Sequence, residues 1–239
     1  MSTKKNWRQV SFVAILGFAV AAGAALAQGA AVPPQCKQPV VGGTVTLPPA
    51  GCKYLTAAQV HEIIGGLPAG TKIILSPIHS DFVCRLGGQK NCIQQGGSLG
   101  GEIEVFASII TFQMTGVSND PTSPLNGWTR TISMPLAVET HTGPRTPGAA
   151  VQSFPTDMHR IQGSLAGDPD FAQLDIVGGT ANGFPSPGHT TLTFLDDGTA
   201  EVDSYFDVTF QITFTGAPGG ILEGAAGTTT GTVRMKAYQ

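Results

Sequence analysis

The longest uninterrupted alternation of apolar and polar residues lies at positions 202–214. One parity carries the apolar side chains of Val202, Phe206, Val208, Phe210, Ile212 and Phe214, and the other carries polar ones. Successive side chains of a strand point to opposite faces, so this segment is predicted to be a strand with one buried and one solvated face. Asp203 and Ser204 interrupt the apolar parity, which predicts a bend or bulge near residues 203–205, so that the strand serves two parts of the sandwich.

The remainder of the chain has the composition of an all-β protein. Gly contributes 32 and Pro 17 of the 239 residues, hydrophobic residues make up 41% and charged residues only 12%. Short apolar runs separated by turn signals predict about eight to ten strands in one antiparallel β-sandwich or flattened barrel. One short N-terminal helix is expected at residues 57–64, because Thr56 and Gln59 form a capping-box pattern and Gly65 follows the apolar stripe.

The first 27 residues have the features of a signal peptide. Lys4, Lys5 and Arg8 precede an apolar run at residues 10–22, which is short for a membrane-spanning helix, and small residues occupy positions 25 and 27. Cleavage is expected after Ala27, and the alternative is an uncleaved membrane anchor. Residues 28–239 are then expected to be a single extracellular β-sandwich domain, secreted or periplasmic, with no membrane association after signal removal.

The charge balance of the mature chain argues against two classes of partner. Without residues 1–27 it holds ten Lys and Arg residues against 16 Asp and Glu residues, a net charge of about −6. It has no basic run, so neither nucleic acid nor an anionic membrane is an expected partner.

All four cysteines lie in the mature chain, at Cys36, Cys52, Cys84 and Cys92. An even count in an exported protein predicts two disulfides, for which three pairings exist. The cost of loop closure favours Cys36–Cys52 and Cys84–Cys92, because these loops are the shortest. A four-cysteine zinc site is the alternative, and it is disfavoured because the chain has no CxxC pair.

Sequence signatures of common hydrolases are missing from the chain, which has no GxSxG, HExxH or P-loop motif. One candidate ion site is the acidic row of Glu201, Asp203 and Asp207. Residues two apart on a strand share a face, so these carboxylates could hold a calcium ion together with loop oxygens. The alternative is a solvated strand face without a ligand.

A second candidate site involves histidines and one arginine. Residues 139–155 are predicted to form the longest irregular stretch, and they include His141 and Arg145. His141, His159 and His189 lie in or next to predicted loops and are candidate binding residues if the fold brings them together. The guanidinium of Arg145 could bind a carboxylate through two parallel hydrogen bonds. The alternatives are scattered surface histidines and an arginine that ties its own loop to Glu139 or Asp157.

Several short segments occur in an order that resembles an uncharacterised family of secreted, β-rich proteins of environmental bacteria. They are residues 66–71 (GLPAGT), 141–145 (HTGPR), 167–171 (GDPDF), 185–189 (PSPGH) and 202–207 (VDSYFD). The resemblance covers most of the mature chain, from about Cys52 to Met235. It implies secretion and a β fold, and it assigns no catalytic residues.

Two functions of different classes are therefore expected. The leading one is a secreted non-enzymatic protein that binds an extracellular ligand or surface component or associates with itself. The alternative is a secreted hydrolase or metal-dependent enzyme with a site around His141, His159 and His189, with Asp157 nearby. Spatial convergence of two of these histidines on a carboxylate would favour the enzyme.

Overall fold

Antiparallel strands make up almost all of the structure. The computed structural model describes residues 33–56, 61–84 and 92–239, and within these it has no α-helix. The described residues form thirteen strands and one 3-10 helix: β1 (Lys37–Val41), β2 (Thr44–Val45), β3 (Lys53–Leu55), β4 (His61–Ile63), β5 (Thr71–Val83), β6 (Ile93–Gln95), β7 (Glu102–Ser118), β8 (Thr129–Thr142), β9 (Val151–Ala166), β10 (Phe171–Gly178), η1 (Thr180–Asn182), β11 (Pro187–Phe194), β12 (Thr199–Gly216) and β13 (Ala226–Tyr238).

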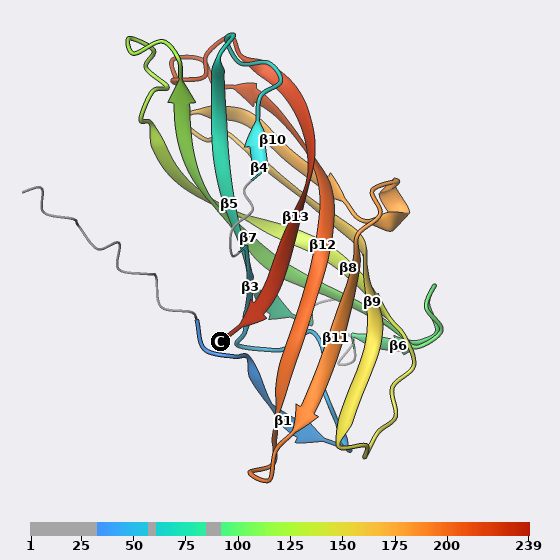
Figure 1. Cartoon of the computed structure of the whole chain (residues 1–239). Coiled ribbons are helices and arrows are strands. Elements are labelled where there is room, and N and C mark those ends of the chain that lie inside the picture. Colours follow the sequence, from blue (N-terminus) through green and yellow to red (C-terminus); the bar gives the residue numbers. More distant parts are fainter. Residues whose placement is uncertain (1–32, 57–60, 85–91) are drawn as a thin grey trace, which may run out of the picture. The chain divides into compact units, whose positions relative to one another are not determined.

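The sheet closes on itself through β12, which contains the alternating segment of the sequence. Its strands follow the order β10-β9-β8-β7-β5-β3-β13-β12, and β12 also pairs with β10. The first half of β12 pairs with β11 and the second half with β10, and both of these partners also pair with β9 (Figure 1). An 18-residue strand is thus long enough to serve two neighbours in succession.

No bulge occurs at residues 203–205, so the expected bulge is wrong, although β12 does pair with two neighbours in succession as expected. The pairing of β12 with β11 and β13 continues through Ser204 without a shift of register. Ser204 stays on the inward parity, where its hydroxyl bonds to Tyr54 Oη at 2.9 Å and to Thr190 Oγ1 at 2.7 Å. Because the interior at this level is polar, β12 can bury the hydroxyl of Ser204 without a bulge.

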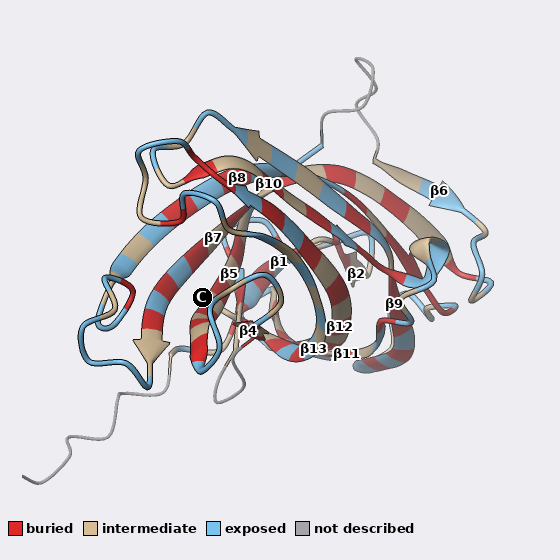
Figure 2. Cartoon of the chain, turned by 90° about the horizontal axis from the view of Figure 1, so that it is seen from above, coloured by how far each residue is buried: buried red, intermediate tan, exposed pale blue. Residues whose placement is uncertain are grey.

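One half of the interior is apolar. Along the strands, buried and exposed residues alternate, as Figure 2 shows. Near β10 the buried set is mainly apolar, with the imidazole of His61 packed against Phe210, and it includes Phe112, Met134, Ile161, Leu174, Ile176, Phe210, Ile212 and Phe214. Burying a side chain of this size contributes roughly 1.5–3 kcal/mol, so this half supplies much of the stability of the fold.

The other half of the interior is polar. Besides the contacts of Ser204, its buried hydrogen bonds join Thr140 to Glu104 at 2.8 Å and His79 to Ser108 at 2.6 Å. A cavity of about 20 Å³ lies among Glu104, Thr156 and Leu47, which is the volume that one water molecule needs. Glu104 Oε1 and Thr156 Oγ1 have no hydrogen-bond partner among the described residues.

Burial shifts the pKa of ionisable groups in both halves of the interior. It raises the pKa of Glu104 to about 7, against the smaller lowering effect of the Thr140 hydrogen bond. It lowers the pKa of His79 to about 4, and it lowers that of His61 to about 4. Desolvation also raises the pKa of Tyr54. Each shift favours the uncharged form, as expected for groups removed from water.

Both expected disulfides are confirmed, with Cα–Cα distances of 5.7 Å for Cys36–Cys52 and 5.4 Å for Cys84–Cys92. The all-β class is confirmed as well. The expected helix at residues 57–64 is wrong where it is described, because His61–Ile63 form β4 and pair with β5. Its first residues, 57–60, lie outside the described residues.

Residues 33–239 form one compact unit. The expected signal peptide, residues 1–27, lies outside the described residues. Within the part of the chain that the structure describes, no helix has the length and hydropathy required to cross a membrane.

Candidate active site

The candidate site lies on β8 and β9, on the outer side of the closed sheet. These strands are longer than the sequence predicted. β8 continues to Thr142 and β9 begins at Val151, so the expectation of irregular structure throughout residues 139–155 is wrong. Regular pairing of β8 with β7 instead holds Glu139 and His141 on a rigid element.

A bulge in β9 brings His159 to the same side of the sheet. Glu139 is opposite Arg160 and Thr140 is opposite Met158, which leaves His159 as the extra residue of β9. Bulges of this kind re-aim a side chain. Met158 on one side of the bulge stays in the core at 3% exposure, while His159 faces Glu139.

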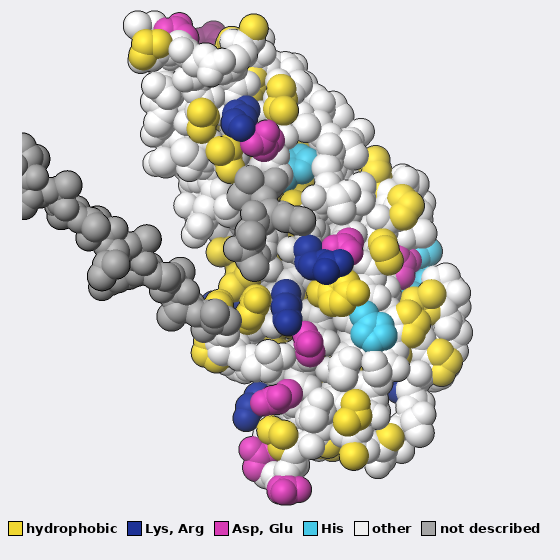
Figure 3. Space-filling model, viewed as in Figure 1, with side chains coloured by type: hydrophobic (Ala, Val, Ile, Leu, Met, Phe, Trp, Pro, Cys, Tyr) yellow, Lys and Arg dark blue, Asp and Glu magenta, His cyan; other side chains and the backbone are white. Residues whose placement is uncertain are grey.

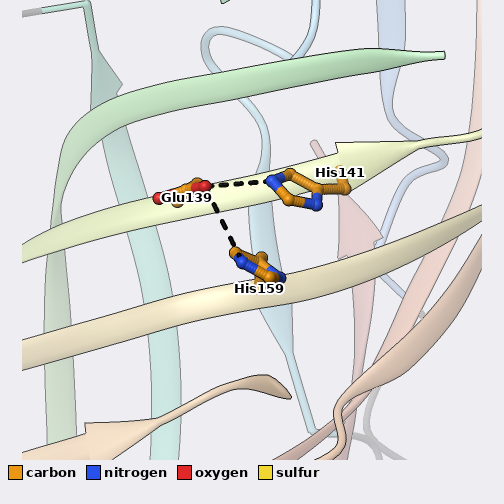
Figure 4. Close-up of side chains that lie close together, drawn as sticks. All are labelled: Glu139, His141 and His159. Atoms are coloured by element: carbon orange, nitrogen blue, oxygen red, sulfur yellow. Dashed lines mark hydrogen bonds and ion pairs between the residues drawn. The ribbon is translucent and has the colours of Figure 1, made fainter. Parts of the chain in front are cut away.

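Glu139 lies beside the two imidazoles and contacts both of them (Figure 4). Its Oε1 is 2.9 Å from Nε2 of His141 and 3.9 Å from Nε2 of His159. The two rings stack, with centroids 3.9 Å apart and planes 19° from parallel. Glu139 and His159 are each 22% exposed, whereas the side chain of His141 is only 6% exposed. Two of the three histidines predicted to converge therefore do converge on a carboxylate.

Ser98 covers His141 from the loop between β6 and β7. Its hydroxyl oxygen lies 2.8 Å from Nδ1 of His141, and its backbone N–H donates to the same nitrogen at 3.1 Å. A backbone N–H is always a donor, so Nδ1 carries the lone pair and Nε2 carries the proton that faces Glu139. These contacts fix His141 as a neutral imidazole whose basic nitrogen points at a hydroxyl group.

The loop that carries Ser98 is fixed at both ends. Gly96 N–H donates to Gly101 O at 2.8 Å, and Gly101 N–H donates to Thr142 O at 3.0 Å, next to His141. A Cβ on Gly101 would lie 2.2 Å from Gly143 O, so only glycine allows this close approach. Ser98 itself is exposed to solvent.

A second carboxylate stands behind His159. Asp157 Oδ2 lies 3.4 Å from Nδ1 of His159, and Thr180 Oγ1 donates to Asp157 Oδ1 at 2.6 Å. The side chains from Asp157 through His159, Glu139 and His141 to Ser98 thus form a continuous row of acidic, basic and hydroxyl groups.

The structure places Arg145 and His189 away from this row. The guanidinium of Arg145 is buried, pairs with Glu102 and donates to Thr44 Oγ1 at 3.0 Å and to Val45 O at 2.7 Å. It therefore ties its loop down, although through Glu102 and not through the expected Glu139 or Asp157. His189 Nε2 is 2.8 Å from Ser153 Oγ on the outside of β9.

Each carboxylate of the acidic row has a basic neighbour. Glu201 Oε1 is 3.9 Å from Lys37 Nζ and Asp203 Oδ1 is 3.0 Å from Lys236 Nζ. Asp207 accepts two hydrogen bonds from Arg234, which lower the pKa of Asp207. Figure 3 shows acidic and basic side chains beside one another on this face of the molecule. Calcium binding by Glu201, Asp203 and Asp207 stays a prediction, and a calcium ion there would compete with these cations.

The key residue that the sequence did not single out is Ser98. It lies in a Gly-rich loop, GGSLGG, that matches no hydrolase signature, and its histidine partner is 43 residues away. Glu139 was considered only as a partner for Arg145. The one available signal was the spacing of Glu139 and His141, since residues two apart on a strand share a face.

No family model, no curated protein and no solved structure matches this chain. The chemistry of the site therefore follows from its geometry. A hydroxyl, an imidazole and a carboxylate hydrogen-bonded in that order is the arrangement that a nucleophile, a general base and the group orienting that base have in hydrolytic enzymes.

Proposed function

We propose that the protein is an exported hydrolase that cleaves ester bonds with Ser98 as its nucleophile. The single observation that carries the proposal is the pair of hydrogen bonds made by His141, at 2.8 Å to Ser98 Oγ and at 2.9 Å to Glu139 Oε1. Serine nucleophiles with a hydrogen-bonded base and an orienting carboxylate recur on unrelated folds, where they are recognised by geometry and not by sequence order.

In the proposed reaction Ser98 Oγ attacks the acyl carbon of the ester while its proton moves to His141 Nδ1. Glu139 stabilises the imidazolium that forms. The proton then passes to the departing alkoxide, which leaves as the alcohol, and Ser98 carries the acyl group. Water attacks this acyl group, gives one proton to His141 and releases the carboxylic acid, after which the proton returns to Ser98.

The loop around Ser98 supports the chemistry in two ways. The backbone N–H groups of Gly97 and Leu99 flank the nucleophile and donate to no described residue, and in the proposed reaction they would donate to the negative charge that develops on the carbonyl oxygen. Because Ser98 is exposed, an ester carried on a large molecule can reach it from solvent. The buried edge of His141 meanwhile keeps the base away from bulk water.

Export is part of the same proposal. Its support is the signal-like start of the chain together with two disulfides, which persist in oxidising compartments. The sequence favours a non-enzymatic binding role because it contains no recognisable catalytic signature. The row from Asp157 to Ser98 favours the enzymatic alternative.

The proposal is tested by measuring hydrolysis of p-nitrophenyl acetate by the purified mature protein. We expect Ser98→Ala to reduce the rate to that of the uncatalysed reaction. We expect Glu139→Gln to lower kcat roughly 10²–10⁴-fold, because the base loses its orienting charge. His189→Gln serves as the matched control, since His189 is an imidazole on the same sheet outside the row. Equal rates for the wild type and Ser98→Ala would exclude the proposal.

A further inference from the structure

We infer that a divalent transition-metal ion of the zinc class binds to Glu139, His141 and His159 and competes with Ser98 for His141. The binding half of this inference stands on the geometry alone, and the inhibitory half rests on the proposed function. The site would then have two mutually exclusive states. In one state His141 is the base for Ser98, and in the other it is a ligand of the metal ion.

The three side chains provide a suitable donor set. One potential ligand atom from each residue lies within 4.8 Å of the other two, and this is the one such group of three among the described His, Cys, Asp and Glu residues. Zinc binds histidine nitrogen and carboxylate oxygen at about 2.0–2.2 Å, so modest side-chain rotation brings all three to one ion. Two imidazoles and one carboxylate favour zinc, copper or nickel over calcium or magnesium.

His159 is oriented for this role by the groups behind it. Its Nδ1 is buried and has no hydrogen-bond partner within the described part of the chain, and the nearest carboxylate is Asp157 at 3.4 Å. A proton on Nδ1 faces that carboxylate, which leaves the lone pair of Nε2 directed at Glu139. Metal-binding histidines commonly donate their second N–H to a carboxylate in this way, and Asp157 is itself held by Thr180.

Competition arises at His141. In the metal-free structure the backbone N–H of Ser98 donates to Nδ1, so the proton of His141 sits on Nε2. A metal ion on Nε2 requires that proton to move to Nδ1, where it meets the Ser98 N–H and can be accepted only by Ser98 Oγ. The hydroxyl then accepts a hydrogen bond instead of donating its proton, and Ser98 loses its base.

The coordination would be incomplete when all three side chains bind. Three protein ligands leave the fourth position of a tetrahedral zinc ion to water, and the partial exposure of Glu139 and His159 gives that position access to solvent. Reversible binding from solution is the behaviour expected of such an open site.

Binding is measured directly by isothermal titration of zinc chloride into the metal-free mature protein. We expect one zinc ion per chain for the wild type, at least about tenfold weaker binding for His159→Gln, and wild-type affinity for His189→Gln. Equal zinc affinity of the wild type and His159→Gln would overturn the metal site. This readout needs no catalytic activity, so it is separate from the test of the proposed function.

Competition is measured as the ratio of the p-nitrophenyl acetate rate with saturating zinc to the rate with chelator. We expect this ratio to fall at least about tenfold below one for the wild type and to stay near one for His159→Gln. A wild type that binds one zinc ion yet keeps a ratio of one would overturn the competition. A wild type that binds zinc at this site and hydrolyses no ester would confirm the metal site while refuting the hydrolase.

Discussion

The hydroxyl oxygen of Ser98 lies 2.8 Å from Nδ1 of His141, although 43 residues separate them in the chain. The contact depends on two features of the fold. β8 continues past Glu139 to Thr142, and the loop between β6 and β7 returns over the end of that strand through the bond from Gly101 to Thr142. The proposed chemistry therefore depends on this loop as much as on the side chains themselves.

Replacing Gly101 with alanine should disconnect the nucleophile from its base. The new Cβ would meet Gly143 O at 2.2 Å and Thr142 O at 2.5 Å, so the loop must move away from β8. We expect ester hydrolysis to fall by at least about tenfold, because the nucleophile is displaced from its base. We also expect a lower unfolding temperature, because Gly101 is buried where the loop joins β7. Gly42→Ala, with no heavy atom within 4 Å of its Cβ, controls for backbone strain at a glycine. Unchanged activity in Gly101→Ala would show that the loop contact is dispensable.

Glu104 should make the protein less stable as the pH rises from about 4.5 to 7. Its pKa is raised from 4.5 to about 7 by burial, so in this range the folded state binds more protons than the unfolded state. The stabilisation is fully present below pH 4.5 and is lost by about pH 7, and for this group alone it is on the order of 3 kcal/mol.

Urea unfolding of the wild type and Glu104→Gln at several pH values measures this contribution. We expect the difference in unfolding free energy between the two proteins to change across pH 4.5–7 by several times its experimental error. Above pH 7.5 we expect this difference to be constant. A difference that is independent of pH would mean that Glu104 titrates normally in the folded state.

His61 and His79 should act in the opposite direction at acidic pH. Burial lowers the pKa of each to about 4, so the unfolded state binds more protons between pH 6.5 and 4. The stability that each neutral imidazole provides is present above pH 6.5 and is lost as the pH falls through 4. We expect His79→Gln to flatten the acid limb of the stability curve, and an unchanged acid limb would contradict the shift.

The Cys36–Cys52 disulfide should stabilise the polar end of the interior. It closes a loop of 16 residues that contains Leu47, which lines the cavity beside Glu104. Replacing both cysteines with serine should lower the free energy of unfolding by about 3 kcal/mol, because the unfolded chain regains the entropy that closing a loop of this length removes. Denaturant unfolding of the double variant measures the change, and a loss below 0.5 kcal/mol would show that the loop is held by its other contacts.

The sequence predicted the fold class and both disulfides because each follows from local information. Alternation at residues 202–214 marked β12 and its buried face, and loop length selected the cysteine pairs. The sequence predicted that Ser204 interrupts the buried face of the strand. Ser204 lies on that face, because a strand can bury a hydroxyl when partners such as Tyr54 and Thr190 lie across the interior. Those partners are set by closure of the sheet, which the alternation of one strand does not encode.

The candidate site was only partly predictable for a similar reason. His141 and His159 were named, and the fold brings them together through strand pairing and a bulge in β9. His189 was a candidate for the same site and instead bonds to Ser153, because β11 pairs with an earlier part of β9. Ser98 reaches the site through a loop whose path depends on single hydrogen bonds, and residue types in a Gly-rich stretch do not specify such a path.

The most direct test of the account is covalent labelling of the mature, metal-free protein with a fluorophosphonate, followed by peptide mass spectrometry. This reagent phosphonylates a serine, with loss of fluoride, when a neighbouring base accepts the proton of the hydroxyl. We expect one label per chain, on Ser98, and a labelling rate at least about tenfold lower in His141→Gln. Absence of label, label on another serine, or equal labelling in His141→Gln would contradict it.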